Sequence, residues 1–204
     1  MSLNFKHFRS ATVAASIALL ALSAPVHAAD KSGRFVVRGG GSDLCSSYSK
    51  AFETKNTQAI ERYAAWIFGY ASATSKLSPQ TLDVSPSSDG RDILAFVLNI
   101  CQTKPAIALE AATATVFSGL GAIRPTVDGP IVTFNADGKS LGVRDETVRF
   151  VERKLKAAGY YKDAEGGKAT PQLIAAIKKF QTEQKLSVSG LPDIRTLIRL
   201  AAQK

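Results

Sequence analysis

The stretch VRFVERKLKAAGYYKDAEGGKATPQLIAAIKKFQTEQKLSVSGLPDIRTLIRL, residues 148–200, decides the fold of the C-terminal part of the chain. Apolar residues recur there in three runs, each with the roughly 3.6-residue period of an amphipathic helix. The first run stops at Gly159, the second follows the helix cap Thr170, and the third begins near Pro192 or Asp193. Three such apolar faces can enclose one small core, so the sequence predicts a three-helix module.

Local signals add detail to this module. We expect Asp145 to cap the first helix, because an aspartate side chain can accept a hydrogen bond from the first turn. Leu186 and Val188 are expected to close the open end of the core. Gly159 and Gly190 are expected to supply backbone conformations that other residues rarely adopt. The residues expected to form the core are Leu155, Ile177, Phe180, Val188 and Leu197.

A set of short motifs runs through the same stretch. They comprise Leu155, Gly159-Tyr160-Tyr161, Ala176-Ile177, Phe180-Gln181, Leu186, Val188, Gly190 and Thr196-Leu197. Their order and spacing resemble the peptidoglycan-binding module found at the ends of many cell-wall enzymes and envelope proteins. The chain departs from that family in its central turn, where Gly166, Thr170 and Leu173 replace the family's Asp, Gly and Thr, and Lys185 replaces a later Gly. Gly167 keeps its place in the turn.

The resemblance implies peptidoglycan as the ligand of residues 144–204. The candidate contacts are Tyr160, Tyr161, Gly167, Gln181 and Arg195. A tyrosine offers a flat apolar face and a hydroxyl, which suits contact with sugar or peptide, although at least one of the pair is expected in the core. The amide of Gln181 could either tie two helices together or face the ligand.

The chain begins with the pattern of a secretory leader. Lys6, His7 and Arg9 precede the apolar run 11–22, which is shorter than the about 20 apolar residues that cross a bilayer, and a small-residue exit follows. We therefore expect residues 1–28 to be a signal peptide that is removed. The product is expected in the periplasm or outside the cell, associated with the wall and without a membrane span.

The positions of the histidines limit which catalytic and metal sites the mature protein can contain. The only two histidines are His7 and His27, so cleavage of the leader would remove both. This would exclude Ser-His-Asp and Cys-His nucleophilic sites and His-ligated zinc, and we expect a protein without catalytic residues, metal or cofactor. The alternative is a wall hydrolase with paired carboxylates, for which Glu61 and Glu110 are the candidates, although solvated helix faces explain them better.

Residues 43–121 predict a four-helix bundle, so the fold class of the whole chain is all-α. The expected helices run from Leu44 to Phe52, from Asn56 or Thr57 to about Ser75, from Ser88 or Asp89 through Cys101, and from Thr103 and Pro105 to Gly119. In an exported protein the pair Cys45 and Cys101 indicates a disulfide tying the first helix to the third, the alternative being two buried thiols.

A weaker resemblance covers this bundle. It rests on the two cysteines, on Trp66-Ile67-Phe68-Gly69-Tyr70, and on Pro105 after Cys101. These features resemble the HdeA acid-stress chaperones and the Rap/Tai immunity proteins that block wall amidases. Either resemblance implies an envelope protein as partner, with the Trp66, Phe68 and Tyr70 patch and the loop 77–90 as the surfaces to consider.

Two connecting segments complete the chain. Residues 29–42 are polar and rich in glycine, so we expect an exposed, disordered arm. Residues 122–143 are expected to connect the two domains, either as a flexible linker or as a hairpin that turns at Asp137-Gly138 and packs on a neighbouring domain.

Charge is concentrated in the C-terminal module. The whole chain has a formal net charge of +9, and from Arg144 onward thirteen Lys or Arg stand against seven Asp or Glu. A basic surface can meet nucleic acid, anionic lipid or an anionic wall polymer. Because export argues against nucleic acid, we expect no nucleic-acid partner.

Overall fold

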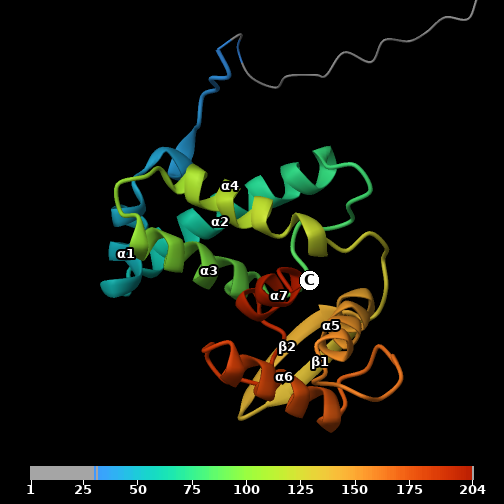
Figure 1. Cartoon of the computed structure of the whole chain (residues 1–204). Coiled ribbons are helices and arrows are strands. Elements are labelled where there is room, and N and C mark those ends of the chain that lie inside the picture. Colours follow the sequence, from blue (N-terminus) through green and yellow to red (C-terminus); the bar gives the residue numbers. More distant parts are fainter. Residues whose placement is uncertain (1–29, 31, 204) are drawn as a thin grey trace, which may run out of the picture. The chain divides into compact units, whose positions relative to one another are not determined.

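The computed structural model describes residue 30 and residues 32–203, so the expected leader at residues 1–28 lies outside the described residues. Residues from Val37 onward form one compact unit. Most of its elements are helices, and one two-stranded hairpin lies among them (Figure 1). This confirms the all-α prediction. Among the described residues, no helix combines the length and the apolar character needed to cross a bilayer.

Four helices make up the N-terminal bundle. They are α1 (Cys45–Glu53), α2 (Thr57–Leu77), α3 (Gly90–Thr103) and α4 (Leu109–Gly119). Two of the expected caps are confirmed, because Asn56 accepts a 3.0 Å hydrogen bond from the Ala59 N–H and Asp89 accepts a 2.9 Å bond from the Arg91 N–H. The expected disulfide between Cys45 and Cys101 is present and joins α1 to α3. Both cysteines are fully buried.

The prediction that the fourth helix begins at Thr103 and Pro105 was wrong. Helix α3 extends through Thr103, and the segment after it is not helical. The Ser46 N–H donates a 2.9 Å hydrogen bond to the Pro105 carbonyl, and the Cys45 N–H donates a 2.9 Å bond to the Ile107 carbonyl. The first N–H groups of a helix have no partner inside it. The segment after α3 therefore caps α1. Because it lies far from α1 in the sequence, no local pattern could predict this cap.

Part of the segment expected to be an exposed arm is folded. A short 3-10 helix, η1 (Gly39–Ser42), packs on the Trp66 ring, whose indole N–H donates a 2.7 Å hydrogen bond to the Arg38 carbonyl. A Cβ atom on Gly41 would lie 2.0 Å from that ring, so only glycine fits there. Tyr70 likewise turns inward and stacks on Phe117 with ring centroids 6.0 Å apart. Trp66 and Tyr70 are thus used inside the bundle, whereas Phe68 is 38% exposed.

The connection between bundle and module contains the hairpin. Strands β1 (Ile131–Ala136) and β2 (Lys139–Arg144) pair antiparallel and lie side by side in Figure 1, with positive φ at both Asp137 and Gly138 in the turn. Such a hairpin is marginal alone in water. Here its Phe134 is fully buried, and the Ser88 N–H and hydroxyl donate hydrogen bonds of 3.0 and 2.9 Å to the Gly142 carbonyl. The hairpin is therefore held both by residues just before α3 and by the helix at 145–157, which both strands contact.

Three helices form the C-terminal module: α5 (Asp145–Ala157), α6 (Pro171–Glu183) and α7 (Ile194–Ala201). Thr170 caps α6 and Asp193 caps α7 through bonds of 3.1 and 2.8 Å to the Leu173 and Thr196 N–H groups. Asp145 was wrongly predicted as a cap. It is the first residue of α5, where its negative charge interacts favourably with the helix dipole. No side chain caps this helix.

The core of the module agrees with the prediction except at Val188. Leu155, Ile177, Phe180 and Leu197 are fully buried, whereas Val188 is 48% exposed and Leu186 is only half-buried. Gly159 and Gly190 have φ angles of 80° and 71°, as their proposed conformational role requires. The loop before α7 is fixed by hydrogen bonds to the buried side-chain amide of Gln181, and this placement turns Val188 outward.

Candidate functional site

Gln181 organises one end of the module. Its side chain is fully buried. The amide nitrogen donates hydrogen bonds to the Ser189 hydroxyl, the Leu191 carbonyl and the Thr196 hydroxyl at 3.1, 3.0 and 2.9 Å. The amide oxygen accepts bonds from the Ser189 and Gly190 N–H groups, each 2.9 Å. Of the two alternatives for this residue, the structure therefore places it where it ties α6 to α7 and not where it could face a ligand.

The two tyrosines divide their roles. Tyr161 is 5% exposed and belongs to the core, which confirms that at least one of the pair is buried there. Tyr160 is half-buried, with its ring centroid 5.5 Å from that of Phe180 in an edge-to-face arrangement and its hydroxyl donating a 2.6 Å hydrogen bond to Glu183. This hydrogen bond raises the pKa of Tyr160. Lys179 lies 5.7 Å over the same ring, so Tyr160 offers a polar edge beside a cation.

The turn that departs from the family motif is held by a buried carboxylate. Glu152 is 1% exposed and accepts hydrogen bonds of 3.1 Å from the Gly166 N–H and 3.0 Å from the Gly167 N–H. The Arg149 guanidinium covers Gly167, 3.1 Å from where a Cβ atom would stand. Gly167 is buried, so it shapes the turn and leaves no backbone surface for a ligand.

Sequence reasoning missed Glu152, although a signal was present. Glu152 lies four residues after Val148 and three before Leu155, which places it on the apolar stripe of the first helix. A charged residue at such a position needs a partner, because burying an unpaired charge is costly. The N–H groups of the following turn are that partner.

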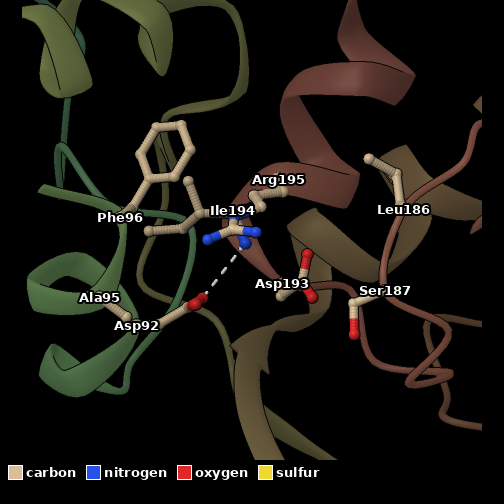
Figure 2. A pocket seen from close by; sticks show the side chains of 8 residues that line it. All are labelled: Asp92, Ala95, Phe96, Leu186, Ser187, Asp193, Ile194 and Arg195. Atoms are coloured by element: carbon tan, nitrogen blue, oxygen red, sulfur yellow. Dashed lines mark hydrogen bonds between the residues drawn. The ribbon is translucent and has the colours of Figure 1, made fainter. Parts of the chain in front are cut away.

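Arg195 lines a cleft between α3 and the beginning of α7. The cleft has a volume of about 230 Å³, and Figure 2 shows the side chains that line it. The residues that line it are Asp92, Ala95, Phe96, Leu186, Ser187, Asp193, Ile194 and Arg195. The Asp92 carboxylate accepts a 3.2 Å hydrogen bond from the Ile194 N–H, which joins the helical domain to the module.

The five candidate contacts do not form one cluster of accessible side chains. Tyr161, Gly167 and Gln181 are buried, Tyr160 is half-buried in the segment after α5 where it packs on Phe180 of α6, and Arg195 is exposed at the cleft. In the described part of the chain, no three His, Cys, Asp or Glu side chains are grouped so that they could hold a metal ion. The cleft is the feature that sequence reasoning could not supply, because Asp92 lies far from the module in sequence.

Asp92 predicts a pH dependence of stability. Burial, and then the charge of Asp193, raise the pKa of this carboxyl group to about 6. A raised pKa means that the folded protein binds the proton more tightly than the unfolded chain, so this group's contribution is most favourable below about pH 4 and is lost as the pH rises through about 6.

We expect Asp92→Asn, which keeps an acceptor for the Ile194 N–H, to remove this term. Between pH 4 and 7 the wild-type free energy of unfolding should fall relative to that of Asp92→Asn, by on the order of 2 kcal/mol. Urea denaturation of both proteins at several pH values measures the difference. Parallel pH profiles of the two proteins would contradict the assignment.

The C-terminal fold and the cleft thus define a small helical module docked on a helical domain. Residues 144–200 match the family described as "Putative peptidoglycan binding domain", which confirms the resemblance found in the sequence. No curated protein and no solved structure matches the chain. The family match supports peptidoglycan binding by the module and suggests an association with the cell wall.

Proposed function

We propose that this chain is a non-catalytic exported protein, which binds peptidoglycan through residues 144–200 and presents the helical domain at residues 43–121 to the cell wall. The observation that carries the proposal is the family match over the module. The non-catalytic part rests on the histidine argument from the sequence and on the engagement of both cysteines, Cys45 and Cys101, in a disulfide.

The surface of the module supplies the electrostatic part of binding. Its exposed cationic side chains are Arg149, Arg153, Lys156, Lys162, Lys168, Lys179, Lys185, Arg195 and Arg199. Peptidoglycan carries carboxylates on its stem peptides, which such a surface attracts. Because exposed charges are screened by salt, the association should weaken as ionic strength rises.

Sedimentation with purified sacculi tests the proposal. We expect the chain without residues 1–28 to sediment with sacculi at low salt. Lys162 and Lys168 are exposed before and within the central turn, and the double change Lys162→Glu and Lys168→Glu should weaken binding about fivefold. The matched change Lys50→Glu and Lys104→Glu alters the same charge on the helical domain and should have little effect.

Two outcomes would contradict the proposal. If the chain stays in the supernatant at low salt, peptidoglycan binding is excluded. If the same protein releases soluble muropeptides from sacculi, the non-catalytic part is wrong, and the carboxylates Glu61 and Glu110 become the first residues to replace. In the structure Glu110 accepts a 3.2 Å hydrogen bond from the Tyr70 hydroxyl, and Glu61 is exposed.

A further inference from the structure

We propose that the cleft between α3 and α7 binds a terminal residue carrying an ammonium and a carboxylate group together, such as the side-chain end of a diamino acid in a peptidoglycan stem peptide. This inference rests on the proposed function and names the chemical group that the wall would present. It also makes the helical domain part of the binding site, because α3 supplies one wall of the cleft (Figure 2).

Asp92 and Asp193 bring negative charge to the cleft without a cationic partner among the described residues. The Asp92 carboxylate accepts hydrogen bonds from the Ile194 N–H, at 3.2 Å, and from the Ser87 hydroxyl. The Asp193 carboxylate accepts hydrogen bonds from the N–H and the hydroxyl of Thr196, each at 2.8 Å. Neither carboxylate lies within 4.0 Å of a cationic side chain in the part of the chain that the structure describes. The two carboxylates repel each other, so a ligand ammonium group placed beside them would be stabilised.

Arg195 brings a cation to the same cleft. Arg195 is exposed, and within the described residues its guanidinium takes part in no ion pair. A guanidinium presents a planar set of donors that matches a carboxylate. Acid and base on one small cleft select a ligand group that carries both charges.

The apolar wall and the size of the cleft also suit such a group. Phe96 and Leu186 line both this cleft and an adjoining hollow, each of about 230 Å³, and the hollow continues along α7 past Ile198 and Arg199. Cavities for drug-sized ligands typically begin near 300 Å³. The cleft therefore suits one terminal residue whose methylene groups pack on the apolar wall, and the rest of the peptide would leave along the adjoining hollow.

Isothermal titration calorimetry of the full chain without residues 1–28 tests the inference. The probe is the stem tripeptide L-Ala-γ-D-Glu-meso-diaminopimelate, whose side chain ends in an ammonium and a carboxylate group. The matched control probe is the same tripeptide with L-lysine as its third residue, which lacks the side-chain carboxylate. We expect the control to bind at least about tenfold more weakly, since one charge-assisted hydrogen-bonding pair is lost.

The variants Asp92→Asn and Arg195→Gln address the two sides of the cleft. Each should weaken binding of the diaminopimelate tripeptide about tenfold or more, because each removes one charged partner of the ligand. Asp92→Asn should weaken both probes, whereas Arg195→Gln should remove most of the difference between them. Lys50→Gln removes one positive charge from the exposed surface of α1 and should leave binding unchanged. Thermal unfolding of each variant shows whether it is folded.

The result separates this inference from the proposed function. If the chain sediments with sacculi but binds neither tripeptide, or binds both equally, the cleft assignment is overturned and peptidoglycan binding stands. Folded Asp92→Asn and Arg195→Gln proteins with wild-type affinity would also overturn it. If the chain neither sediments nor binds the tripeptide, both proposals are wrong.

Discussion

Replacing Gln181 with alanine is expected to lower the free energy of unfolding by about 3–5 kcal/mol, because it leaves several buried polar groups without partners. The amide makes hydrogen bonds to Ser189, Gly190, Leu191 and Thr196. Loss of both ends of this network releases the loop before α7 as well as creating a cavity. Urea denaturation followed by circular dichroism measures the effect as a lower midpoint.

Gln172 provides the matched control for this change. It lies on the same helix, α6, and is exposed, so Gln172→Ala should alter the stability by less than about 0.5 kcal/mol. A Gln181→Ala protein with wild-type stability and without affinity for sacculi would show that Gln181 contacts ligand. That outcome would reverse the assignment made from its burial.

Removal of the disulfide is the second change with a large expected effect. The double replacement Cys45→Ala and Cys101→Ala should cost roughly 4 kcal/mol, because the bond closes a loop whose ends are 56 residues apart and restricts the unfolded chain. Both residues are fully buried, so loss of packing adds to this effect. Equilibrium denaturation of the two proteins under oxidising conditions gives the difference.

A reducing agent supplies the control for the disulfide prediction. It should destabilise the wild-type protein and leave the double alanine variant unchanged. A loss below about 1 kcal/mol on removal of the bond would mean that packing of α1 against α3 alone holds the bundle. The loop-closure account of its stability would then be wrong.

The sequence predicted those features whose causes lie within a few residues. The caps Asn56, Asp89 and Thr170 were among those expected because a helix N-terminus is satisfied by the residue next to it. The helices of the module follow from their apolar period, and its short motifs identified the family that the comparison confirmed. For residues 122–143 the sequence left a flexible linker and a hairpin as alternatives. The hairpin is stable because Phe134 is buried in the core.

Tertiary structure decided which polar groups are buried and which surfaces meet. Glu152 and Gln181 accept hydrogen bonds from backbone N–H groups of the loops that follow them in the chain. Val188 is exposed because the loop bound by Gln181 is fixed in place. The cleft exists only because Asp92 of α3 meets Ile194 of α7. A periodic pattern specifies a face of a helix, but the partner of a buried charge or amide depends on segments brought together by folding. The sequence by itself thus determined the elements and the family of the module, and the packing of the chain decided its candidate binding site.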